Sequence, residues 1–96
     1  MRQVQQLISE ECKQLAELLI EKNRKYGNSA IDPCRIFSKA DPLEQLRVRI
    51  DDKLSRIKNM QPDDMEDPIH DLLGYLILYR VCEKVQKEKQ DGLSVR

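Results

Sequence analysis

The sequence contains no tryptophan, and aromatic residues make up only 4% of its 96 positions. Glycine occurs three times and proline four times. Such a scarcity of turn-forming and aromatic residues is typical of a helical domain and argues against a sandwich or a barrel. A chain of this length also has room for only one hydrophobic core. We therefore predict a single all-α domain over residues 1–96.

An excess of charge of either sign is also missing, because 17 Lys and Arg residues balance 17 Asp and Glu residues. No overall field therefore attracts nucleic acid, and no aromatic residues accompany the basic ones as a stacking platform. Glycine-rich phosphate loops and Walker patterns are absent, which excludes a P-loop protein. Nucleic acid is not an expected partner, and any anion must bind at a local site.

The three cysteines, Cys12, Cys34 and Cys82, lie far apart and include no CxxC pair. A structural zinc site needs four closely arranged ligands, so zinc is not expected. An odd number of cysteines also argues against a secreted disulfide framework. Free cysteine is commonly buried, and we predict that Cys12 and Cys82 are small core residues.

Long hydrophobic runs are lacking as well. The longest one, residues 72–82, is broken by Arg80 and has about half of the ~20 residues needed to cross a bilayer. At the start of the chain, Arg2 is followed by polar glutamines instead of an apolar signal segment. We expect no membrane partner and a cytoplasmic location.

Apolar residues at helical spacing predict three helices, over residues 3–25, 42–60 and 68–89, with a frayed tail over residues 90–96. Asp41-Pro42 and Asp67-Pro68 both have the cap-then-proline pattern of a helix start. Gly27 suits the left-handed position at the end of the first helix.

The third predicted helix is apolar on nearly every face between residues 72 and 82. Such a helix must be covered on several sides, and two partner helices of one chain cover only part of it. We therefore expect a second subunit to cover the rest, in an oligomeric helical bundle that is a dimer or a tetramer.

Charged residues form a stripe on the second predicted helix, where Arg49, Asp52, Lys53 and Arg56 share one face at i, i+3, i+4 and i+7. One interpretation is a row of surface ion pairs, Arg49–Asp52 and Asp52–Arg56, each worth about 0.2–0.5 kcal/mol. The other is the wall of a site that holds phosphate and a metal ion. Periodicity alone does not choose between them.

Other charged residues lie beside apolar faces. Glu11 and Lys22 fall within the apolar stripe of the first helix. One interpretation is that both are functional groups that face the interior. The other is that Glu11 lies at the edge of the stripe and that Lys22 extends to solvent near the helix end. Asp71 shares a face with apolar residues of the third helix, although the helix dipole alone would favour an acid in its first turn. Glu66 lies just before that helix. His70 lies on a different face from Asp71 and is not expected to be catalytic.

Each of the three helices supplies acids, and one of them also supplies cations. The acids suit a hard divalent cation held by carboxylate oxygens, and the Lys and Arg residues suit phosphate oxygens. Water activated by this ion, with charge neutralised at phosphorus, would then support hydrolysis.

Three blocks occur in order along the chain: Lys22-Asn23-x-x-Tyr26-Gly27-Asn28-Ser29, Arg49-x-x-Asp52-Lys53-x-x-Arg56 and Glu66-x4-Asp71-Leu72-x2-Tyr75. Together they resemble the small phage and bacterial MazG-like proteins, also described as the nucleotide-modification-associated domain, among the all-α nucleoside triphosphate pyrophosphatases. The resemblance implies an oligomeric all-α enzyme that cleaves a nucleoside triphosphate to the monophosphate and pyrophosphate with Mg²⁺, or with Mn²⁺ in its place. It also implies that the cytoplasm is that of a bacterial cell or a phage-infected host.

The resemblance also implies roles for individual residues. Asp52 and Asp71 would be the catalytic acids and would bind the metal, with Glu11 and Glu66 as further metal candidates. The phosphate-binding and substrate-binding residues would be Lys22, Arg49, Lys53, Arg56, Tyr26 and Tyr75, of which the two tyrosines would shape the base or sugar pocket.

The chain departs from the family pattern in its acids. Gln14 follows Glu11 where the family usually has a second acid, Pro68 stands three residues before Asp71, and Lys25 and Asn28 replace further acids. Fewer acids neutralise less metal charge, so a nucleotide-binding protein without turnover, which sequesters or senses a signalling nucleotide, is the alternative function. A structural oligomer or protein-interaction module is the second alternative.

Overall fold

The computed structural model describes residues 1–60, 65 and 67–92. Within this part of the chain there are three α-helices, α1 (Val4–Tyr26), α2 (Pro42–Lys58) and α3 (Pro68–Gln90), and no strand. The predicted all-α class is confirmed, and each predicted helix boundary lies within two residues of the observed one. Residues 93–96 of the predicted tail lie outside the described residues.

The helix ends are stabilised by the cap residues that the sequence indicates. Asp41 Oδ1 accepts a hydrogen bond from the backbone N–H of Glu44, and Asp67 Oδ1 accepts one from that of His70, both at 3.0 Å. Each carboxylate thus satisfies an N–H that has no partner inside the helix. Gly27 ends α1 with a φ of +68°, a conformation that favours glycine, and its N–H donates to Asn23 O at 2.7 Å.

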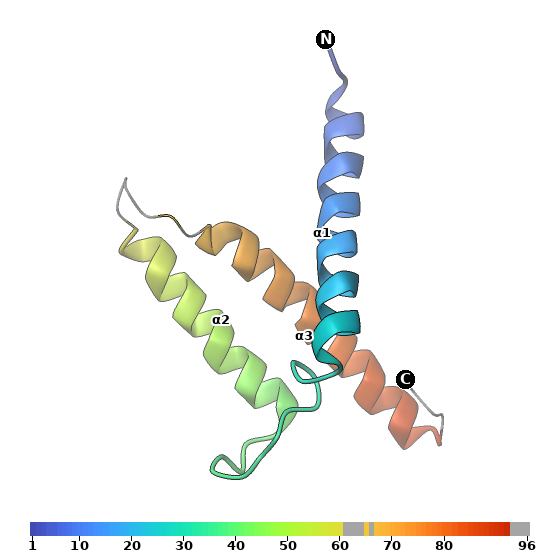
Figure 1. Cartoon of the computed structure of the whole chain (residues 1–96), viewed down its shortest axis with the longest axis vertical. Helices are drawn as coiled ribbons and strands as arrows, with labels where there is room; N and C mark the ends of the chain where they lie inside the picture. Colours follow the sequence, from blue (N-terminus) through green and yellow to red (C-terminus); the bar gives the residue numbers. More distant parts are fainter. Residues whose placement is uncertain (61–64, 66, 93–96) are drawn as a thin grey trace.

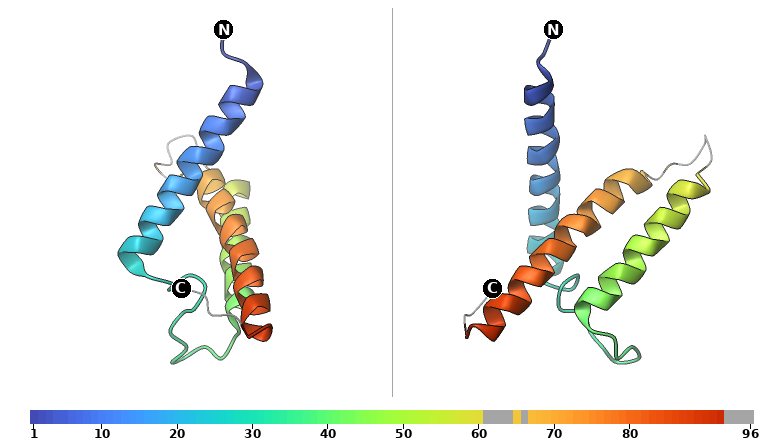
Figure 2. Two further views of the ribbon diagram at one scale, coloured as in Figure 1. Left: turned by 90° about the vertical axis from the view of Figure 1, so that its right-hand side faces the viewer. Right: turned by 180° about the vertical axis from the view of Figure 1, so that it is seen from behind.

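Helices α2 and α3 lie side by side and antiparallel, as Figure 1 and both views of Figure 2 show. The core of the described residues lies between them, where the side chains of Leu46 and Cys82 are each only 1% exposed. Cys82 is therefore a core residue, as predicted. A short connection between two amphipathic helices favours this antiparallel contact.

Helix α1 crosses α3 and continues beyond it, so that its N-terminal half stands clear of the other two helices (Figures 1 and 2). No residue of α1 is buried. The two helices are in close contact at Gly74, where an added Cβ would meet Leu19 Cδ2 at 3.4 Å. Cys12 is exposed, so its predicted core position is wrong for the single chain, because this part of α1 has no helix packed over it.

The apolar character of α3 leaves several large side chains in contact with solvent: Ile69, Leu73, Leu76, Ile77 and Val81. The described part of the chain has no helix that is long and apolar enough to span a bilayer. The molecule is elongated, with extents of 48 × 31 × 22 Å.

Candidate nucleotide-binding hollow

A hollow of about 690 Å³ lies between the C-terminal half of α1, the turn that follows it and the first half of α3. Its lining includes five of the residues that the sequence singled out: Lys22, Tyr26, Arg49, Asp71 and Tyr75. They come from all three helices, because α2 contributes Arg49 across the face of α3. The hollow therefore unites residues from each of the three sequence blocks.

Two cation–aromatic contacts lie in or near the hollow. The guanidinium carbon of Arg49 is 6.0 Å from the centre of the Tyr75 ring, at the outer limit of a cation–π contact. On α1, Lys25 Nζ lies 5.6 Å from the centre of the Tyr26 ring, although Lys25 itself does not line the hollow. Lys22, Arg49 and Tyr26 are all exposed, so their heads can reach a ligand.

Most of the lining of the hollow is apolar. The apolar residues include leucines of α1 and aliphatic residues of α3: Leu15, Leu18, Leu19, Ile77, Leu78 and Val81. A hollow with a largely apolar lining and a few convergent charged groups is the usual form of a small-molecule site, and its volume lies within the ~300–1,000 Å³ that such sites occupy.

Lys53 and Asp71 form an ion pair between α2 and α3, with 3.3 Å between Lys53 Nζ and Asp71 Oδ2. The Lys53 side chain is 14% exposed and that of Asp71 is 38% exposed. Lys53 lies nearest the apolar face of α2, so its stem is covered while its ammonium group reaches the first turn of α3. This pair joins the second and third sequence blocks at the edge of the hollow.

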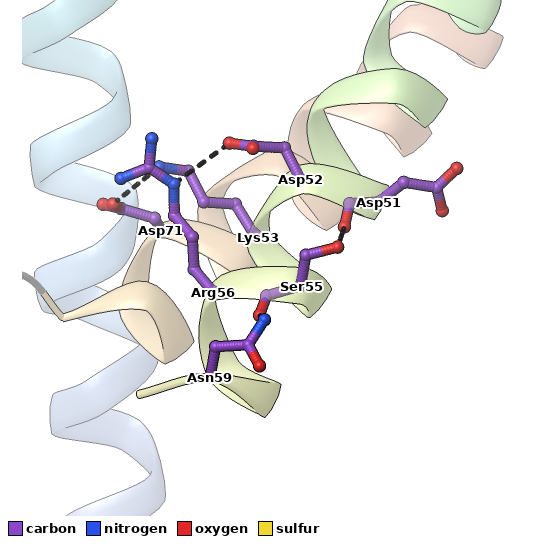
Figure 3. A network of polar contacts seen from close by, with 7 residues as sticks. All are labelled: Asp51, Asp52, Lys53, Ser55, Arg56, Asn59 and Asp71. Atoms are coloured by element: carbon purple, nitrogen blue, oxygen red, sulfur yellow. Dashed lines mark hydrogen bonds and ion pairs between the residues drawn. The ribbon is translucent and has the colours of Figure 1, made fainter. Parts of the chain in front are cut away.

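Asp52 and Arg56 pair on the surface of α2, with Arg56 Nε donating to Asp52 Oδ2 at 3.2 Å. Figure 3 shows Asp52, Lys53, Arg56 and Asp71 gathered on one side of α2, whereas Asp51 points away from them. Both Asp52 and Arg56 are about half exposed, so their i,i+4 pair contributes only about 0.3–0.5 kcal/mol. Neither residue is part of the lining of the hollow.

The predicted metal ligands do not meet in the part of the chain that is described. No three His, Cys, Asp or Glu residues there are close enough together to hold a metal ion. Asp52 and Asp71 are each paired with a cation, and Glu11 lies exposed on α1 and does not line the hollow. Glu66 lies outside the described residues. The described residues alone thus do not assemble the Mg²⁺ site that the resemblance implies.

Sequence reasoning did not assign several polar residues that line the hollow: Asn23, Asn28, Ser29 and His70. Asn23 Nδ2 donates to Gly27 O at 3.2 Å and to Asn28 Oδ1 at 2.8 Å, which holds the turn after α1 in shape. Asn23 and Asn28 both belong to the first sequence block, but asparagines at this spacing are as typical of a helix end as of a binding loop, so the sequence alone did not assign them to the site.

The comparisons with protein-family models, curated proteins and solved structures find no match for this chain.

Proposed function

We propose that this protein binds a nucleotide in the hollow between α1 and α3. Lys22 and Arg49 would hold the phosphates, and the base would lie against the apolar lining beside Tyr75. The observation that carries the proposal is the convergence of cations and a tyrosine from three helices on a hollow with a largely apolar lining. Charge-assisted hydrogen bonds to phosphate are strong, and a base requires a flat, largely apolar surface.

A second candidate function is the magnesium-dependent hydrolysis of a nucleoside triphosphate, with water added and the monophosphate and pyrophosphate released. Two observations favour it: Asp71 lines the same hollow as the cations, and the three blocks follow the order found in MazG-like proteins. Asp71 and Asp52 are the acids we assign to this activity, with Glu66 as a further candidate. Because both aspartates are paired with cations, binding without turnover is the better supported of the two functions.

Nucleotide binding is tested by thermal shift and calorimetry with the common ribo- and deoxyribonucleoside triphosphates, with and without Mg²⁺. We expect at least one of them to bind, and Arg49→Met and Lys22→Met each to weaken it about tenfold, the worth of one lost charge-assisted contact. Lys58→Met is the matched control, because Lys58 is an exposed cation of α2 that does not line the hollow. If no nucleotide binds, the proposal fails and the structural-module alternative stands.

Hydrolysis is tested in the same samples by chromatography of the products, with Mg²⁺ and then Mn²⁺. Monophosphate formation that is lost in Asp71→Asn would establish the enzyme. Bound nucleotide that stays intact with either ion would instead establish a binding protein.

We also propose that the protein is a homo-oligomer, a dimer or a tetramer. The chain exposes 8102 Å², whereas a compact monomeric protein of 11.3 kDa exposes about 5,700 Å². Its radius of gyration is 15.7 Å, against about 12.5 Å expected for a compact domain of this length.

A free nucleotide as ligand also agrees with the predicted cytoplasmic location.

A further inference from the structure

Helix α3 carries an uncovered apolar stripe on the side next to the hollow. The stripe consists of Ile69, Leu73, Leu76 and Ile77, which follow one another at i, i+4, i+7 and i+8 and are all exposed. This spacing places them on one continuous face of the helix. Ile77 also borders the hollow, but the other three are not part of its lining.

The N-terminal half of α1 carries a second uncovered stripe, formed by Val4, Leu7 and Ile8. It continues the face from which Leu15 and Leu19 line the hollow against α3. One half of this face therefore lies against α3 of its own chain, and the other half projects beyond the body of the molecule (Figures 1 and 2).

We propose that a second copy of this chain covers both stripes, with the N-terminal half of α1 of each copy lying on the α3 stripe of the other. The surface beyond that of a compact monomer is about 2,400 Å² per chain, which approaches what each partner of a large obligate homodimer buries. A two-fold exchange covers the α1 stripe and the α3 stripe in one closed interface, without leaving an open end for further chains.

The same contact fixes one wall of the nucleotide site. Lys22 and Tyr26 belong to α1, and no residue of α1 is buried within its own chain. The partner would hold α1 at its N-terminal half and so hold Lys22 in place across the hollow. This consequence rests on the proposed function, because it makes nucleotide affinity depend on assembly.

Light scattering and sedimentation at micromolar concentration test the interface, with Ile8→Glu and Leu73→Glu as the disrupting variants. We expect the wild type to have at least twice the 11.3 kDa mass of one chain and each variant to fall to 11.3 kDa. Ile8 is 57% exposed and lies far from the core, so its replacement leaves the fold of one chain intact, which circular dichroism verifies. Ser9→Glu adds the same charge to a neighbouring polar position and should leave the mass unchanged.

A wild-type mass of 11.3 kDa would overturn the interface, and so would variants that keep the full oligomer.

Nucleotide affinity gives the second readout, measured with the triphosphate that binds the wild type most tightly. Ile8 does not line the hollow, yet we expect Ile8→Glu to weaken binding about tenfold and Ser9→Glu to leave it unchanged. Dissociated Ile8→Glu with wild-type affinity would refute the link between assembly and the site. A wild type that binds no triphosphate refutes the proposed function instead, and the masses alone then decide the interface.

Discussion

Helices α1 and α3 each span 23 residues, but only α3 shares a buried core with another helix of its chain. Leu46 of α2 and Cys82 of α3 are almost fully buried where the two helices meet, whereas α1 has no buried residue. Both α1 and α2 have an apolar stripe at helical spacing. Such a stripe shows that a helix must be covered, but it does not show which surface covers it.

The connections explain the difference between the two regions. Residues 59–67 make a short link between α2 and α3, and short links favour antiparallel neighbours. Residues 27–41 make a longer link between α1 and α2, which permits α1 to depart from the pair. The α2–α3 pair therefore holds the buried core residues Leu46 and Cys82, and α1 has no buried residue.

The largest effect is expected from truncation in the α2–α3 core. Leu46→Ala should lower the free energy of unfolding by about 2–5 kcal/mol, because it removes buried methyl groups and leaves a cavity. Ile20→Ala on α1 removes a similar side chain that is 69% exposed, and its cost should stay within about 0.5 kcal/mol. Urea denaturation measures both values. Equal costs at the two positions would show that α1 and the pair are equally well packed.

A smaller effect is expected where charge joins α2 to α3. Lys53→Met keeps the apolar stem but leaves Asp71 without its cation, and it should lower the free energy of unfolding by about 1 kcal/mol. Arg80→Met breaks the exposed Arg80–Glu83 pair within α3 and should cost only about 0.3 kcal/mol. The same denaturation assay compares them. A neutral Lys53→Met would mean that the pair adds nothing to the contact between the helices.

The finest comparison uses the three thiols, labelled with iodoacetamide near pH 8 and followed by mass spectrometry. Cys34 is exposed and should react fast, whereas Cys82 should react slowly because burial both blocks access and raises the pKa of its thiol. A raised pKa keeps Cys82 protonated, so its contribution to stability is complete below the unfolded pKa of about 8.5 and declines as pH rises above it.

Cys12 then reports on α1. It is exposed in the single chain and lies at the edge of the α1 stripe, so a covering partner would slow its labelling relative to Cys34. Ile8→Glu should restore the faster rate. Equal labelling of Cys12 and Cys34 in the wild type would indicate that this part of α1 stays open.

Only part of the candidate site could be predicted from the sequence. The three sequence blocks predict Lys22, Arg49, Asp71 and Tyr75 as site residues, and all four line the hollow. Pairing was harder to predict, because Arg49 could meet Asp52 within its own helix or Tyr75 across the gap. It lies beside Tyr75, at the outer limit of a cation–π contact. Such choices depend on the distance between α2 and α3, which helical spacing does not contain.

The sequence by itself determined the class of the fold and the bounds of α1, α2 and α3, because caps, prolines and helical periodicity act within a few residues of chain. Only the tertiary structure decided that Lys53 faces Asp71, that Lys22 and Arg49 share one hollow, and that half of α1 is left bare. These features depend on how far each helix lies from the next and in which direction it runs. The links between helices and the packing of one small core set both.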